Sequence, residues 1–181
     1  DYTSITVDFD EKTPVYVGRS QIAAENEQGL RVDVSDAGTN SRISRKHGFF
    51  HHMVSAHRGG GNLLLYTDRS TNHSAVMRPK IDQESGTITY QTKMGMRNDA
   101  DEYKTLPIYP GTVVEFAESP TIEDAKGVLV LCMRNPLKDT EWTFIRLSSM
   151  KDIPPSVLKP LIHSGEAQVQ VINDTMSPIE R

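Results

Sequence analysis

The chain has 181 residues, of which 36% are hydrophobic and 24% charged, and its formal net charge is -4 at pH 7. This length fits one domain with an extension, and the composition excludes a chain that is disordered throughout. A net negative charge argues against general binding to nucleic acid or to acidic membranes, because both require an excess of Lys and Arg. Any site for an anion must therefore be local.

The single cysteine and the absence of long apolar runs bear on location. No apolar run approaches the length of a membrane span, and no basic-then-apolar start indicates a signal peptide. Cys132 has no second cysteine to pair with, which favours a reducing compartment, and we expect a cytoplasmic location. Because Cys132 lies inside an apolar run, we predict a buried, inert thiol rather than a nucleophile.

Short runs with the alternating pattern of half-buried strands recur along the sequence, separated by breaks rich in Gly and Pro. In chain order we expect strands at 3–9, 15–17, 30–34, 49–54, 62–67, 74–77, 87–91, 112–116 and 128–133. The Gly-rich segment 58–61 predicts an antiparallel hairpin between 49–54 and 62–67. The apolar run at 128–133 is typical of a central, buried strand. The polar, unpatterned segment 93–105 indicates a mobile insertion.

The character of the sequence changes after Asn135-Pro136. We expect a strand at 142–147, a short helix at 156–163 bent by Pro160, a last strand at 168–172 and a flexible tail. The sequence thus predicts a domain at 1–134 with an insertion around 78–105, and an extension at 135–181 that packs back on the domain. Many short strands without a long helix favour an all-β sandwich over a βαβ arrangement.

Three loops at strand ends carry residues suited to an anion. The first holds Gly18-Arg19, the second is the run from Ser41 to His47, and the third is the segment from Asp68 to Ser74. A phosphate monoester carries about -1.5 to -2 charges near neutral pH and offers three strong acceptor oxygens. Guanidinium groups, hydroxyls and loop amides are the donors that such a group binds. We hypothesise that the three loops meet in space to bind one phosphate.

The order and intervals of Gly18-Arg19, Ser44-Arg45-Lys46-His47 and Ser70-Thr71-Asn72 resemble the forkhead-associated (FHA) domain family. The resemblance covers roughly residues 3–134. It implies an FHA-like β-sandwich of about eleven strands, whose loops at one end bind a phosphothreonine peptide. With the extension, the expected fold is all-β with a short C-terminal helix.

The resemblance also assigns roles to single residues. Arg19 would contact peptide and phosphate, Ser44 would meet the phosphate with its hydroxyl and amide, and Arg45 would contact the phosphate beside it. Thr71 and Asn72 match the pair in the third loop, where Asn72 would hydrogen-bond the peptide backbone. Each of these residues also has a plainer interpretation as a solvated charge or a turn residue.

Two further residues support the expected site, and two positions modify it. Gly18 and a buried His47 would brace the loops. Arg42 is a candidate reader of an acidic residue that follows the phosphothreonine in the peptide. The family has Gly after the Asn, whereas this sequence has His73, so either His73 accepts a positive φ or the turn differs. An imidazole at the rim would strengthen anion binding when protonated, below about pH 6.5.

The expected function is a phosphothreonine-dependent interaction module that works downstream of a Ser/Thr kinase, without catalytic residues, cofactor, metal, nucleic acid or membrane. One alternative is an FHA-like scaffold that binds partners without phosphate. Another is a metal-dependent enzyme built on His47, His51, His52 and His57. The metal alternative is disfavoured because His51 and His52 would point to opposite faces of a strand and no carboxylate lies within the cluster.

Overall fold

The computed structural model describes residues 4–9, 14–18, 29–31, 43–44, 46–54, 62–82, 84–90, 93–96, 104–117 and 127–153. Within these ranges the protein forms thirteen strands and one short 3-10 helix, with no α-helix. The prediction of an all-β fold is therefore confirmed. The predicted helix at 156–163 and the predicted strand at 168–172 lie outside the described residues.

The larger sheet has six strands, and every neighbouring pair in it is antiparallel. Its spatial order is β1 (Ser4–Asp8), β13 (Lys138–Leu147), β12 (Val128–Asn135), β11 (Val113–Phe116), β6 (Ser74–Met77) and β9 (Lys93–Gly95). β12 is central and buried over its first five residues, as its apolar sequence predicts. The buried thiol of Cys132 is also confirmed, and burial raises its pKa.

The second sheet has five strands, in the order β10 (Thr105–Ile108), β5 (Asn62–Asp68), β4 (Gly48–Val54), β2 (Val15–Gly18) and β3 (Gly29–Arg31). β4 and β5 form the predicted antiparallel pair. β2 pairs with β4 antiparallel and with β3 parallel. In the described part of the chain the two sheets together hold eleven strands, of which β13 lies in the segment that the sequence assigned to the extension.

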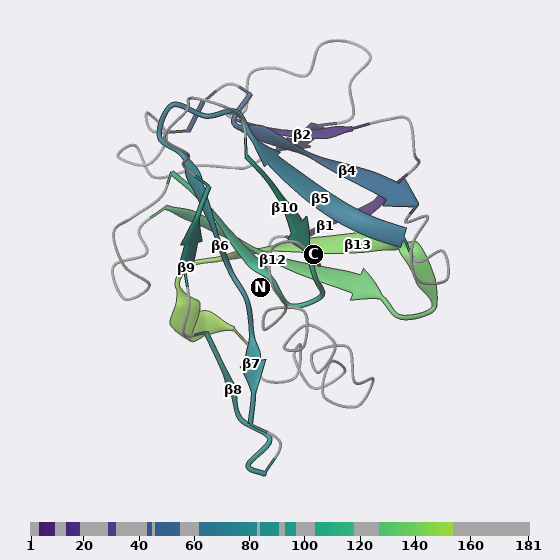
Figure 1. The fold of residues 1–181 in the computed structure, drawn as a ribbon, viewed down its shortest axis with the longest axis vertical. Helices are drawn as coiled ribbons and strands as arrows, with labels where there is room; N and C mark the ends of the chain where they lie inside the picture. Colours follow the sequence, from purple (N-terminus) through teal and green to yellow (C-terminus); the bar gives the residue numbers. More distant parts are fainter. Residues whose placement is uncertain are drawn as a thin grey trace.

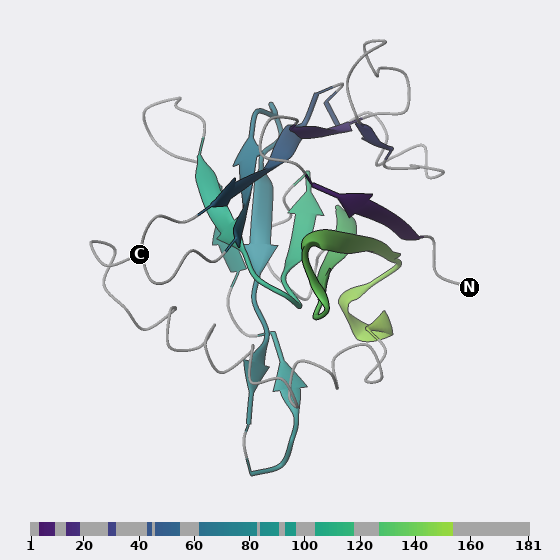
Figure 2. The same ribbon diagram turned by 90° about the vertical axis from the view of Figure 1, so that its right-hand side faces the viewer.

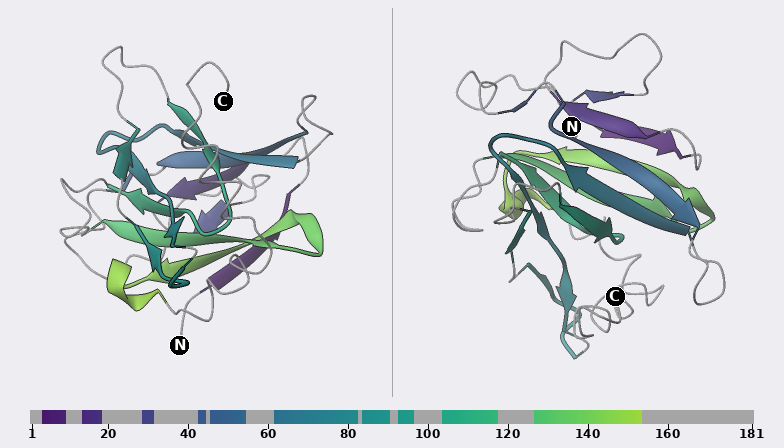
Figure 3. Two further views of the ribbon diagram at one scale, coloured as in Figure 1. Left: turned by 60° about the horizontal axis from the view of Figure 1, so that its bottom comes forward. Right: turned by 45° about the horizontal axis from the view of Figure 1, so that its top comes forward.

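The core lies between the two sheets. Phe50 and Tyr66 of the second sheet pack against Phe116 and Phe144 of the larger one, and ring centroids of Phe50 and Phe144 are 4.8 Å apart. β4 and β5 (blue) lie across β12 and β13 (green) in Figures 1 and 3. Burial of such aromatic side chains is the main favourable term that joins the two layers.

A two-stranded hairpin of β7 (Lys80–Ile81) and β8 (Ile88–Thr89) projects from one end of the molecule (Figure 2). At its base, the hydroxyl of Tyr90 donates a hydrogen bond to the carbonyl of Gly111 at 2.6 Å. Tyr90 belongs to a second apolar cluster on the outer face of the larger sheet. The 3-10 helix η1 (Met150–Asp152) and Ile153 pack on the same cluster.

The structure differs from the sequence prediction mainly at short strands. β7, β9 and β10 have two to four residues each. The sequence predicts a mobile insertion at 93–105. In the structure, β9 lies in this segment and pairs with β6, and β10 begins at its end and pairs with β5. β13 begins at Lys138 and pairs with both β12 and β1, so the larger sheet continues into the segment assigned to the extension. Trp142 and Phe144 are buried in the core.

In the described part of the protein, no helix is long and apolar enough to cross a bilayer.

Candidate functional site

The end of β2 and the loop after β5 meet at the backbone of His47. The N–H of His47 donates to the carbonyl of Val17 at 2.8 Å, and the carbonyl of His47 accepts from the N–H of Arg69 at 2.8 Å. Gly18, the last residue of β2, therefore lies beside the second loop, and His47 lies between β2 and the third loop. The sequence places Arg19 directly after this point, but Arg19 lies outside the described residues.

The side chain of His47 joins the same loops from within. It is fully buried, as predicted, and its ring packs edge-on against Phe116 with centroids 5.6 Å apart. Nδ1 accepts from the N–H of Ser44 at 3.2 Å, while Nε2 lies 3.2 Å from the carbonyl of His73. These two contacts require the neutral tautomer with hydrogen on Nε2. The N–H of Ala117 is 3.3 Å from Nε2 and 3.0 Å from the His73 carbonyl, so we assign it to the carbonyl.

Electrostatics agree with a neutral His47. Burial lowers its pKa to about 4, which is too low for the ring to carry a charge at neutral pH. His47 therefore braces the loops through two directional hydrogen bonds and does not itself supply positive charge to an anion.

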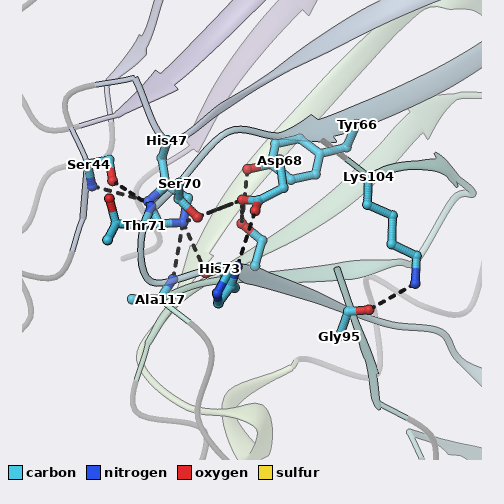
Figure 4. A network of polar contacts seen from close by, with 11 residues as sticks. Ser44, His47, Tyr66, Asp68, Ser70, Thr71, His73, Gly95, Lys104 and Ala117 are labelled. Carbon is cyan, nitrogen blue, oxygen red and sulfur yellow. Dashed lines mark hydrogen bonds and ion pairs between the residues drawn. The ribbon is translucent and has the colours of Figure 1, made fainter. Parts of the chain in front are cut away.

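Ser44 and Thr71, from the second and third loops, are in direct contact. The backbone N–H of Thr71 donates to Oγ of Ser44 at 3.3 Å (Figure 4). Ser44 and Asn72 are half-buried and Thr71 is exposed, so the junction is open to solvent. An oxygen that accepts from Thr71 can still donate its own hydrogen to a further acceptor. The amide of Ser44, by contrast, is directed to His47, whereas the family resemblance assigns that amide to the phosphate.

A buried polar network, which sequence reasoning missed, lies beneath the junction. One carboxylate oxygen of Asp68, Oδ1, accepts from the hydroxyls of Ser70 at 2.7 Å and Ser74 at 2.8 Å. Since the Ser74 hydrogen is directed to Asp68, the Tyr66 hydroxyl donates to Oγ of Ser74 at 3.1 Å. Burial raises the pKa of Asp68. The network holds the start and end of the third loop together, and the Asp and Ser residues of this loop were its only signal in the sequence.

Gly48 makes room for this network. A Cβ at Gly48 would lie 2.2 Å from the hydroxyl oxygen of Tyr66 and 2.5 Å from the backbone carbonyl oxygen of Thr67. Both distances are shorter than a van der Waals contact, so only Gly fits next to Tyr66 here.

His73 adopts the conformation that the family's Gly would favour. Its φ is 60°, in the left-handed region that a bulky residue rarely enters. Its carbonyl is held by His47 and Ala117, which keeps the backbone in place. The ring Nδ1 lies 4.0 Å from Oδ2 of Asp68. The His73 ring therefore lies beside the carboxylate of Asp68.

Two cations flank the junction on the outer side of the second sheet. Nζ of Lys46 lies 5.0 Å from the ring centroid of Tyr16, and Cζ of Arg69 lies 5.7 Å from that of Phe49. Both cations are exposed. The other predicted cations of the site, Arg19, Arg42 and Arg45, lie outside the described residues.

The histidine cluster of the metal alternative is divided between the two faces of β4. His52 is buried and stacks on Phe9 with centroids 6.2 Å apart, whereas His51 is half-buried and lies beside Phe49 at 5.4 Å. The prediction that these neighbours point to opposite faces is confirmed. Among the described residues, no group of three or more His, Cys, Asp or Glu side chains could hold a metal ion. His57 lies outside them.

Comparison of the sequence with family models, with curated proteins and with solved structures found no match in any of the three.

Proposed function

We propose that the protein is a phosphothreonine-dependent interaction module, whose site is the junction of loops at the end of β2, before β4 and after β5. The contact between Ser44 and Thr71 carries the proposal. In it the backbone N–H of Thr71 donates to the hydroxyl oxygen of Ser44, which joins two loops whose contacting residues are 27 positions apart in the sequence, at an exposed point.

The chemistry of the junction suits a phosphate. The hydroxyls of Ser44 and Thr71 are donors at its surface, and charge-assisted hydrogen bonds to phosphate are roughly twice as strong as neutral ones. Arg45 follows Ser44 directly and Arg19 follows Gly18, so two guanidinium groups belong to the same loops. Neutral His47 and the network around Asp68 hold the loops in position, which limits the entropy that a ligand must remove.

The resemblance to the FHA family supports the same function, through the order of its three motifs. In the proposed site Ser44, Arg45 and Arg19 bind the phosphate, Thr71 and Asn72 bind the peptide beside it, and Arg42 reads an acidic residue that follows the phosphothreonine. The module has no catalytic role of its own and needs a Ser/Thr kinase to create its ligand.

An oriented library of phosphothreonine peptides tests the proposal, with the unphosphorylated and phosphoserine libraries as comparisons. We expect capture of phosphothreonine peptides alone, and a loss of roughly tenfold or more in affinity for Ser44→Ala and for Arg19→Ala, since a hydrogen bond to a charged group contributes about 1.5–3 kcal/mol. Ser148→Ala is the matched control, because Ser148 is exposed and follows β13. Fluorescence of the buried Trp142 reports that each variant is folded.

Retained phosphopeptide binding in both Ser44→Ala and Arg19→Ala would overturn the proposed site. Equal capture of phosphorylated and unphosphorylated peptides would favour the phosphate-independent scaffold instead.

A further inference from the structure

A row of aromatic rings runs along the outer face of the second sheet, away from the core. Tyr16 of β2 and Phe49 of β4 are register partners, with ring centroids 5.6 Å apart, and the ring of His51 follows at 5.4 Å from Phe49. All three are half-buried, whereas their neighbour Phe50 is fully buried in the core. Because side chains alternate across a strand, the three rings share the outer face.

This row is continuous with the proposed phosphate site. Lys46, whose ammonium lies over Tyr16, is two positions after Ser44. Arg69, whose guanidinium lies over Phe49, is two positions before Thr71. Each cation is held over a ring by a cation–π contact, which favours this placement of an otherwise flexible side chain. We call Tyr16, Lys46, Phe49, His51 and Arg69 the aromatic–cation strip.

The strip has a definite chemical preference. It presents two exposed positive charges on an apolar body, in a protein whose net charge is -4. An acidic partner is repelled by the protein as a whole and attracted at this face, which gives orientation as well as affinity. Aromatic faces between the cations favour an aliphatic or aromatic side chain of the same partner.

We propose that the aromatic–cation strip binds an acidic segment, with at least one apolar side chain, that flanks the phosphothreonine in the same partner. The proposal rests on the proposed function, because the phosphate anchors the partner at Ser44 and Thr71. Because Lys46 and Arg69 lie close in sequence to Ser44 and Thr71, the strip contacts residues near the phosphothreonine. Met53, on the same face of β4 and 51% exposed, extends the apolar surface further.

The test compares flank preferences in the phosphothreonine library, for the parent protein and for the double variant Lys46→Gln/Arg69→Gln. We expect the parent to enrich Asp and Glu near the phosphothreonine. Both proteins carry Arg42→Gln in this comparison, so that the acidic residue assigned to Arg42 does not contribute. The double variant should keep its dependence on phosphate, lose this enrichment, and bind an acidic-flanked peptide roughly three- to tenfold more weakly. Raising the salt concentration should reduce the parent's preference in the same way.

The matched control is Lys80→Gln/Lys151→Gln, which removes two exposed charges from β7 and η1, away from the strip. It should bind as the parent does. A second variant, Phe49→Ala, should lower the enrichment of apolar residues and, because the ring under Arg69 is lost, part of the enrichment of Asp and Glu.

The outcomes separate this inference from the function on which it rests. Phosphate-dependent capture with no acidic preference, or with a preference that survives in Lys46→Gln/Arg69→Gln, would overturn the strip and leave the proposed function standing. Capture of acidic peptides without phosphate, lost in the double variant, would support the strip as a binding surface and overturn the phosphate site. No specific capture by the parent would overturn both.

Discussion

The pKa of His47 gives the sharpest test of the loop junction. Burial lowers this pKa from 6.5 to about 4 in the folded protein. As the pH falls below 6.5, the unfolded protein binds a proton at this position before the folded protein does, so stability falls. The contribution of neutral His47 to the free energy of unfolding is fully present above pH 6.5 and is lost between pH 6.5 and about 4. It changes no further below that range.

The expected size follows from proton linkage with these two pKa values. Relative to pH 8, protonation of His47 in the unfolded protein costs about 2 kcal/mol of stability at pH 5 and about 3 kcal/mol at pH 4. Asp68 opposes this trend at the acid end, because burial raises its pKa and the folded protein then takes up that proton first. His51, whose pKa is also lowered by burial, adds to the trend. A substitution at His47 alone isolates the part of the pH-dependent loss of stability that His47 causes.

His47→Gln retains an acceptor and a donor but cannot titrate. Urea unfolding between pH 7.5 and 4.5, followed by fluorescence of Trp142, should show a smaller loss of stability on acidification in the variant than in the parent. Trp142 is the only tryptophan and is 2% exposed, so it reports global unfolding. Ring-proton NMR of the parent gives the His47 pKa directly, even if the variant does not fold. An equal loss of stability between pH 7.5 and 4.5 in the parent and in His47→Gln would refute a buried, neutral His47. A His47 ring that titrates near pH 6.5 would refute it as well.

Two further predictions concern the residues around the junction. Gly48→Ala should lower the free energy of unfolding by about 1–3 kcal/mol, and with it the urea midpoint, because its Cβ would overlap the Tyr66 hydroxyl and the Thr67 carbonyl. Adding Tyr66→Phe should recover only part of the lost stability, because the Thr67 carbonyl remains in place. A urea midpoint of Gly48→Ala equal to that of the parent would contradict the close packing at Gly48. His73→Gly should raise stability by up to about 1 kcal/mol, because Gly adopts the φ of 60° without strain. A loss of stability in the same assay would mean that the contact of the His73 ring with Asp68 outweighs the backbone strain.

Alternation and turn chemistry determined the longer strands. β6 matches the predicted range 74–77, and β4, β5, β11 and β12 agree within two residues at each end. The turn between β10 and β11 follows local chemistry in the same way, since Pro110-Gly111 suits a type II turn. Gly111 has a φ of 87°, and the N–H of Thr112 donates to the carbonyl of Tyr109 at 3.0 Å. Such features depend on neighbouring residues, which the sequence displays directly.

The short strands that the sequence did not predict, β7, β9 and β10, were decided by their partners. β9 carries no clear alternation, and its residues are strand because they hydrogen-bond to β6. β13 begins at Lys138, where it pairs with Asn135 of β12, and β1 pairs with it from Glu141 to Ile145. Pairing energy from distant residues outweighs weak local preference in such segments.

For the candidate site, the sequence by itself determined the hydroxyls and cations of the three loops, and the presence of His73 directly after Asn72. It did not determine how these loops are held. Gly48 meets Tyr66 across the β4–β5 pair, and Asp68 meets Ser74 only because the third loop folds back on itself. The tertiary structure also decided that His47 is neutral and that the Ser44 amide is directed to it, because burial and hydrogen-bond direction depend on contacts between segments far apart in the sequence.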